Sequence, residues 1–203
     1  ELGILDKSEV SYRQAIVLKP NYAEAHYSLG VLLQEQGKLD EAKASYTQAI
    51  AFKSDYAEAY NNLGVTLQEL GKLDEAEASY KQAITFKPDY AEAQNNLGVT
   101  LQDLGKLDKA EASYRQAIVL KPDYAETHYN LGITLQDLGK LDEAEASYAQ
   151  AIAFKPDYAE AHNSLLDCSY LLDKQSLFFD QLDYLINEGA ANATIGSLTC
   201  RSA

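Results

Sequence analysis

A period of 34 residues runs through most of this chain and constrains its fold more than any other feature. Residues 61–84 read NNLGVTLQELGKLDEAEASYKQAI, and residues 95–118 read NNLGVTLQDLGKLDKAEASYRQAI. A Leu-Gly pair recurs at the same spacing, at 29–30, 63–64, 97–98 and 131–132. Self-similarity at a fixed period of this length predicts small supersecondary units that stack on one another.

Each unit contains two stretches with the apolar spacing of a helix. In residues 57–90 the first stripe consists of Ala59, Leu63, Leu67 and Leu70. The second stripe follows Gly71 and consists of Leu73, Ala76, Tyr80, Ala83 and Ile84. Pro88 then ends the second helix, because proline cannot continue it. The sequence therefore predicts an all-α chain of helix pairs, with small residues such as Gly64 where helices approach and the Tyr80 ring beside them.

Acidic residues stand at the expected start of each helix. Asp55 and Glu58 form the pattern of a capping box for one helix, and Asp74 and Glu77 form it for the next. Acid at a helix N-terminus is also favoured by the helix dipole. We interpret most of the acidity of the chain as a consequence of this helical structure.

The period predicts the following organisation. Residues 1–22 hold the second helix of a truncated unit, and 23–56, 57–90, 91–124 and 125–158 are four complete units. Residues 159–189 are a degenerate unit whose second helix, 175–188, caps the array, and 190–203 are a linker or disordered tail. Residues 1–3 match 69–71, so we expect the chain to be a piece of a longer protein.

Composition excludes several classes of partner. The chain has 17 basic and 31 acidic residues, and its net charge of −14 repels phosphate backbones and anionic lipid surfaces. No apolar run approaches the roughly 18 residues of a membrane span. Two cysteines, Cys168 and Cys200, do not make a disulfide framework, so we expect a reducing, cytoplasmic location.

The sequence carries no catalytic or cofactor-binding pattern that we recognise. Six residues separate Gly64 from Gly71, where a phosphate-binding loop needs four, and Leu follows Lys72 where Ser or Thr is needed. His26, His128 and His162 share one repeat position in different units, so we expect packing or surface roles. Cys168 lies on an apolar helix stripe and is expected in the core. We predict a segment that is not an enzyme, with no cofactor and no metal.

These features resemble the tetratricopeptide repeat. The resemblance is carried by the 34-residue period, the Leu-Gly pair, the run G-x-x-x-x-A-x-x-x-Y-x-x-A of the second helix and the closing proline. It extends from residue 1 to about residue 172. It implies a right-handed α-solenoid of antiparallel helix pairs, in which the first helices line a concave groove.

The face of the first helices opposite their packing stripe carries the candidate binding residues. They are Tyr27, Ser28, Gln34, Glu35, Asn61, Asn62, Gln68, Glu69, Asn95, Asn96, Gln102, Asp103, Tyr129, Asn130, Gln136 and Asp137. The resemblance places them in the groove. Asn62, Asn96 and Asn130 form a ladder at one-repeat spacing, similar to the asparagine ladder in the repeat arm of O-linked N-acetylglucosamine transferases. An amide both donates and accepts hydrogen bonds, which suits the backbone of an extended peptide.

The charge of this face narrows the expected ligand. Chaperone-binding members of the family clamp a C-terminal carboxylate with Lys, Arg and Asn, but these positions hold no Lys or Arg. We therefore expect a neutral or basic protein segment as partner.

Three functions remain open at this stage. The first is a peptide-binding scaffold without catalysis. The second is the recognition arm of a larger modifying enzyme, for example a glycosyltransferase. The third is self-assembly into filaments. Bulky Phe178 at a position where other units have alanine argues against the third, so we expect a monomer.

Overall fold

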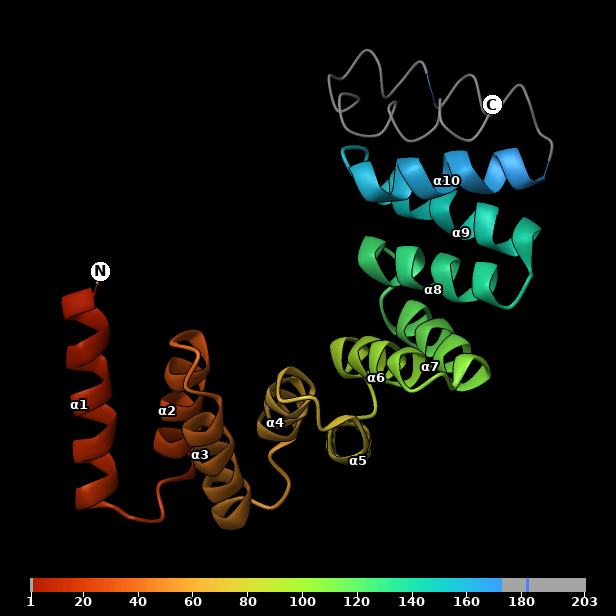
Figure 1. Ribbon diagram of the computed structural model, residues 1–203. Coiled ribbons are helices and arrows are strands. Elements are labelled where there is room, and N and C mark those ends of the chain that lie inside the picture. The colour runs from red at the N-terminus through yellow and green to blue at the C-terminus, as the bar shows by residue number, and fades with distance from the viewer. Residues whose placement is uncertain (1, 173–181, 183–203) are drawn as a thin grey trace. The chain divides into compact units, whose positions relative to one another are not determined.

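The computed structural model of the chain describes residues 2–172 and residue 182, and every regular element among residues 2–172 is an α-helix (Figure 1). The helices are α1 Leu2–Leu18, α2 Ala23–Glu35, α3 Leu39–Phe52, α4 Ala57–Glu69, α5 Leu73–Phe86, α6 Ala91–Asp103, α7 Leu107–Leu120, α8 Ala125–Asp137, α9 Leu141–Phe154 and α10 Ala159–Leu171. The predicted all-α array of helix pairs is confirmed for this part of the chain. None of its helices is both long and apolar enough to cross a lipid bilayer.

The chain divides into two compact units at Lys106. Unit 1 contains α1 to α6, and unit 2 contains α7 to α10. In each unit the helices pack in chain order, so that each second helix (α3, α5, α9) lies between the first helix of its own pair and the first helix of the next. First helices also contact one another, α2 with α4 and α4 with α6 in unit 1, and α8 with α10 in unit 2.

The close contact inside each pair depends on a glycine that faces a tyrosine. A Cβ atom added to Gly64 of α4 would lie 2.6 Å from Cε1 of Tyr80 on α5. Tyr80 is fully buried, and Gly30 with Tyr46 and Gly132 with Tyr148 repeat this contact. Only a residue without a side chain lets the ring lie flat on the first helix. The expected role of Gly64 and Tyr80 is confirmed.

A second glycine makes the turn between the two helices of a pair. Gly71 has φ of +72°, in the left-handed region that favours glycine. Its N–H donates to the carbonyl of Gln68, and the next N–H, of Lys72, donates to the carbonyl of Leu67. These bonds satisfy carbonyls at the end of α4 and reverse the chain within three residues.

The predicted capping boxes are wrong. Helix α4 has Tyr56 at its N-cap and α5 has Lys72, and neither helix has a side-chain cap hydrogen bond. Asp55 comes one residue too early to cap α4, and Asp74 lies inside α5. The N-cap tyrosine is instead covered by the Lys53 ammonium, 4.1 Å from the ring centroid. Glu58 of α4 and Asp74 of α5 lie in the first turns of their helices, where the helix dipole favours an acidic residue.

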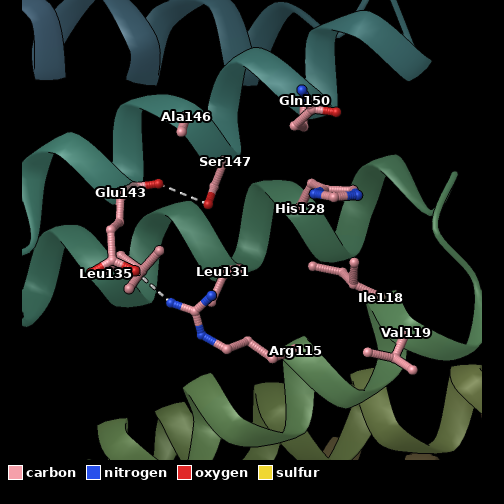
Figure 2. Close-up of a pocket in the computed structure, with 10 residues that line it drawn as sticks. All are labelled: Arg115, Ile118, Val119, His128, Leu131, Leu135, Glu143, Ala146, Ser147 and Gln150. Carbon is pink, nitrogen blue, oxygen red and sulfur yellow. Dashed lines mark hydrogen bonds and ion pairs between the residues drawn. The ribbon is translucent and has the colours of Figure 1, made fainter.

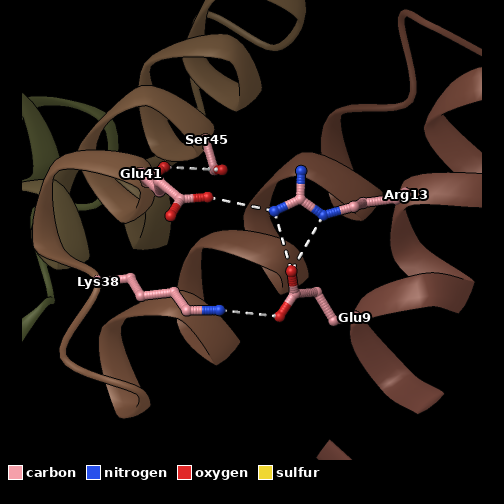
Figure 3. A network of polar contacts seen from close by, with 5 residues as sticks. All are labelled: Glu9, Arg13, Lys38, Glu41 and Ser45. Carbon is pink, nitrogen blue, oxygen red and sulfur yellow. Dashed lines mark hydrogen bonds and ion pairs between the residues drawn. The ribbon is translucent and has the colours of Figure 1, made fainter. Parts of the chain in front are cut away.

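Ion pairs connect consecutive second helices (Figure 3). Glu9 of α1 accepts hydrogen bonds from Arg13 on the same helix, at 2.9 Å, and from Lys38 ahead of α3, at 3.2 Å. Arg13 also donates to Glu41 of α3 at 3.2 Å. The same residue types repeat these contacts in unit 2, where Arg115 bridges Glu111 and Glu143, and Lys140 pairs with Glu111.

Glu77 holds the equivalent position on α5. Hydrogen bonds from Lys106 and Lys81 lower the pKa of this buried carboxyl to about 2. Glu77 is therefore ionised across the physiological range and bridges α5 to the turn ahead of residue 107.

The helices fall inside the predicted repeats. Repeats 23–56, 57–90 and 91–124 contain α2 with α3, α4 with α5, and α6 with α7. Repeat 125–158 contains α8 with α9. Helix α10 lies within 159–189, and Cys168 on it is buried, as expected for a core residue. The predicted capping helix at 175–188, apart from residue 182, and the predicted tail at 190–203 lie outside the described residues.

Candidate functional site

The predicted binding residues lie at equivalent positions on the first helices of each unit, and we name these positions the first-helix face. It comprises Tyr27, Ser28, Gln34 and Glu35 on α2, Asn61, Asn62, Gln68 and Glu69 on α4, Asn95, Asn96, Gln102 and Asp103 on α6, and Tyr129, Asn130, Gln136 and Asp137 on α8. Within each helix these positions fall in an arc of about 120°, because successive residues advance by about 100°. The acidic members are exposed, and most of the others are half-buried.

Asparagines of unit 1 form a continuous chain of hydrogen bonds across this face. Asn96 Nδ2 of α6 donates to Asn61 Oδ1 of α4 at 3.1 Å. Asn61 Nδ2 donates to Asn62 Oδ1 at 3.2 Å, and Asn62 Nδ2 donates to the Tyr27 hydroxyl of α2 at 3.1 Å. The chain thus runs from α6 through α4 to α2, with every amide oriented in the same direction.

Burial separates the asparagines into two roles. Asn61 and Asn95 are buried, so they support their neighbours rather than meet solvent. Asn62 and Asn96 are half-buried and present an edge at the surface. Two recorded bonds occupy one N–H and one lone pair of Asn96, whose oxygen accepts from Asn95 at 3.5 Å. An amide has two N–H groups and two lone pairs, so a donor and an acceptor remain for an incoming peptide unit.

Glutamines form a second polar row on the same face. Gln34 accepts from the Tyr46 hydroxyl at 3.0 Å and donates to Glu69 on the next first helix at 3.2 Å. Gln68 accepts from the Tyr80 hydroxyl at 3.2 Å and donates to Asp103, again at 3.2 Å. Each glutamine therefore links the second helix of its own pair to an acidic residue one repeat further along.

Unit 2 carries one repeat of the same surface on α8. The Tyr148 hydroxyl donates to Gln136 at 2.9 Å. The Tyr129 ring lies 5.0 Å from the ring of Tyr158 and 6.0 Å from that of Tyr148, centroid to centroid. Asn130 is half-buried and Asp137 is exposed, as at the equivalent positions of unit 1.

Tyr27 of this face is neutral at physiological pH, because its pKa is raised. Burial raises the pKa of Tyr27, although the hydrogen bond from Asn62 opposes this, and burial raises the pKa of Tyr56 to about 12. The Tyr27 ring lies 5.0 Å from the Tyr56 ring. The charges of the face are then Glu35, Glu69, Asp103 and Asp137, and no face position holds a cation.

Sequence reasoning missed the tyrosines that support the glutamines. Tyr46, Tyr80 and Tyr148 were expected only as packing residues, yet their hydroxyls fix the amides of Gln34, Gln68 and Gln136. The constant separation of 12 residues between each glutamine and its tyrosine is the signal in the sequence. Thr100, which donates to Gln68 at 3.3 Å, was also missed.

The histidines have structural partners. Nε2 of His26, His128 and His162 each lies 2.8–2.9 Å from the carbonyl oxygen of the proline six residues earlier. His26 and His128 also pack on Phe52 and Phe154. Within the part of the chain that the structure describes, no three His, Cys, Asp or Glu side chains gather as a metal site.

Family models match nearly all of the described chain. Residues 1–37, 32–71, 67–105 and 100–139 match a model described as TPR repeat, and residues 125–158 match one described as tetratricopeptide repeat. The chain belongs to the tetratricopeptide repeat family. Members of this family are typically scaffolds for protein interactions, and the described helices form a tetratricopeptide array.

Solved structures show the same tetratricopeptide fold. MamA superposes with a TM-score of 0.72 and 25% identity, over 78% of this chain and 92% of that one. YrrB, described as a TPR protein with an unusual peptide-binding site, gives 0.78 and 21%, over 95% and 98%. PilF of Pseudomonas aeruginosa gives 0.84 and 19%, over 98% and 90%. At these identities YrrB and PilF support the fold alone. No curated protein matches the sequence.

Proposed function

We propose that the first-helix face binds an extended protein segment that is neutral or basic. The observation that carries the proposal is the row of oriented side-chain amides, in which Asn96, Asn61 and Asn62 hydrogen-bond from one first helix to the next. Hydrogen bonds between neighbours fix each amide before a ligand arrives, so little side-chain entropy is lost on binding.

An extended segment fits this surface better than a helix does. A helix satisfies its own backbone groups, whereas an extended chain needs outside donors and acceptors for its N–H and C=O groups. Asn62 and Asn96 lie one repeat apart and supply both hydrogen-bond donors and acceptors. YrrB, which shares the fold, is a protein with a peptide-binding site, and this supports a peptide as ligand.

Charge favours a basic segment over an acidic one. Glu69 and Asp103 are exposed and accept hydrogen bonds from Gln34 and Gln68, and no cation of the face balances them. A peptide with Lys or Arg gains from these carboxylates, and an acidic peptide is repelled. The net charge of −14 also disfavours nucleic acid and anionic membrane as partners. We further expect a cytoplasmic monomer.

A peptide array tests the charge preference. We would compare peptides of equal length and graded charge for binding to the full chain and to the double variant Glu69→Lys/Asp103→Lys. Basic peptides should bind the natural chain best, and the variant should lose about tenfold in affinity for them. As a matched control, Glu75→Lys/Asp89→Lys makes the same charge change at exposed positions off the face. Lysine already occupies the position of Glu75 one repeat later, at Lys109.

The amide row needs a separate test with neutral peptides. Asn96→Ala should lower the affinity for neutral peptides about tenfold, because one peptide group of the ligand loses both a hydrogen-bond donor and an acceptor. Gln82→Ala removes an exposed amide from α5, off the face, and should leave affinity unchanged. If both variants bind alike, the asparagines do not hold the ligand, and the proposal fails.

The same surface would also serve as the recognition arm of a larger modifying enzyme such as a glycosyltransferase. The asparagine row at one-repeat spacing, which resembles that of O-linked N-acetylglucosamine transferases, is the feature that favours this second candidate. The gene that encodes the chain tests it. A catalytic domain in the same reading frame would support the recognition arm, and a gene without one would eliminate it.

A further inference from the structure

A hollow lies in unit 2, between α7 and α9 (Figure 2). We name it the α7–α9 groove. Its volume is about 480 Å³, and α8 forms its floor with Leu131 and Leu135. Ile118 and Val119 of α7 line one wall, and Ala146 of α9 lines the other.

The α7–α9 groove is distinct from the first-helix face. Floor residues His128, Leu131 and Leu135 project from one side of α8. Asn130 and Asp137 project from the opposite side of α8. Asn130 follows His128 by two positions and Asp137 follows Leu131 by six, which turns each of them by about 120–200° around the helix axis. A ligand in the groove therefore touches none of the amides of the first-helix face.

The rim of the groove carries balanced charge. Arg115 of α7 donates to Glu143 of α9 at 2.6 Å, so the pair crosses between the two walls. Ser147 donates its hydroxyl to the carbonyl of Glu143, one turn earlier on α9. A charged ligand would have to break the ion pair, whereas a neutral apolar one leaves it intact. The groove is thus suited to an uncharged, apolar surface.

Unit 1 repeats the same set of residues between α1 and α3. Each residue that lines the α7–α9 groove has an identical counterpart three repeats earlier, Arg13, Val17 and Glu41 among them. Arg13 pairs with Glu41 as Arg115 does with Glu143. The first-helix face, in contrast, changes over the same interval, from Ser28 to Asn130 and from Glu35 to Asp137.

An exposed valine is shared by these two sites and absent at the equivalent position of the other repeats. Val17 and Val119 are each 71% exposed, although the burial of an apolar side chain is favourable in free energy. The same position holds Ala51, Thr85 and Ala153 elsewhere, which are small or polar. The two valines extend the apolar floor out to the surface where a partner would meet it.

We propose that the α7–α9 groove, and its counterpart between α1 and α3, dock an amphipathic helix of a partner protein that presents large apolar side chains and no net charge. A helix is the fitting occupant because it satisfies its own backbone, and the walls offer no row of amides for an extended chain. The hollow between α7 and α9 has room for one apolar stripe of a helix, formed by residues i, i+3, i+4 and i+7. The inference is independent of the proposed function of the first-helix face.

Valine methyl NMR on the full chain separates the two surfaces. The chain has six valines, of which Val31, Val65 and Val99 lie on the first helices, and Val10, Val17 and Val119 lie on α1 and α7. The probe is a neutral helical peptide of about 15 residues with leucine at i, i+3, i+4 and i+7. Its control has glutamine at those four positions. We expect saturable shifts of the Val119 and Val17 methyl signals with the leucine peptide only, and none at Val31, Val65 or Val99.

Two variants check that the groove itself is responsible. Ala146→Glu places a charge in the wall and should weaken binding at Val119 about fivefold or more. Ala149→Glu makes the same change on α9 at an exposed position that does not line the groove, and should leave the Val119 shift unchanged. Circular dichroism shows that each variant is folded.

Five results would overturn the proposal. The first four are no saturable shift at Val119, an equal shift with the glutamine peptide, no effect of Ala146→Glu, and shifts at Val31, Val65 and Val99 instead. The fourth would assign the peptide to the first-helix face. Val119 shifts that depend on protein concentration without peptide would make a second copy of the chain the occupant, and would also overturn it.

Discussion

Gly64 and Tyr80 are the contact on which the packing of one helix pair depends. The ring is fully buried and lies where a Cβ of residue 64 would be, at 2.6 Å. We predict that Gly64→Ala destabilises the chain by about 1–3 kcal/mol in urea unfolding, because the ring must move. Tyr80→Leu should cost less in the Gly64→Ala background than alone, since it relieves the overlap. Strictly additive effects would show that the two residues do not compete for space.

Glu77 gives the stability a defined dependence on pH. Its pKa is about 2 in the folded chain, below the usual value of 4.5, because Lys106 and Lys81 favour the charged form. The unfolded chain therefore binds this proton more readily, so the stabilisation is fully present above about pH 4.5 and is lost as pH falls towards 2.

Replacing Glu77 tests this directly. Glu77→Gln should lower the free energy of unfolding by about 1 kcal/mol at pH 7, and the difference from the natural chain should vanish near pH 2. Glu75→Gln is the matched control, since that exposed carboxylate meets only Lys43, at 3.4 Å. Urea titrations at several pH values measure both. A deficit of Glu77→Gln that persists unchanged at pH 2 would contradict the ionic account.

At the scale of helices, the sequence predicted the elements well but not how they are joined. Apolar spacing, Gly71 and Pro88 located the helices of a pair, because these signals are local. The capping boxes failed because Tyr56 and Lys72, not the acids, occupy the N-caps. The amide chain from Asn96 to Tyr27 could not be predicted, since it depends on the rotation and spacing of neighbouring first helices.

That amide chain also predicts a structural cost at Asn61. Asn61→Ala removes a buried amide that donates to Asn62 and accepts from Asn96. We expect a loss of about 1–3 kcal/mol in the free energy of unfolding, because two partners lose a hydrogen bond beside apolar surroundings. Gln82→Ala, at an exposed site on α5, should cost little by the same measurement. Equal stability of the two variants would show that the chain of amides does not support the fold.

At the scale of the whole molecule, the net charge of −14 acts on any ligand before contact. We predict that a basic peptide associates faster with the chain at low ionic strength, and that affinity falls as NaCl rises from about 0.05 to 0.5 M. Affinity for a neutral peptide of the same length should change little, since amide contacts are not screened. Stopped-flow fluorescence measures the association and dissociation rates of each peptide, and their ratio gives the affinity. Identical salt dependence for the two peptides would contradict a charge-guided ligand.

The central claim is that the first-helix face holds an extended segment, and valine methyl NMR with the preferred peptide from the array tests it most directly. Our account predicts saturable shifts at Val31, Val65 and Val99, which lie on the first helices of unit 1, with Val10, Val17 and Val119 unchanged. Shifts confined to Val10, Val17 and Val119 would contradict it, because the ligand would then lie on the second helices.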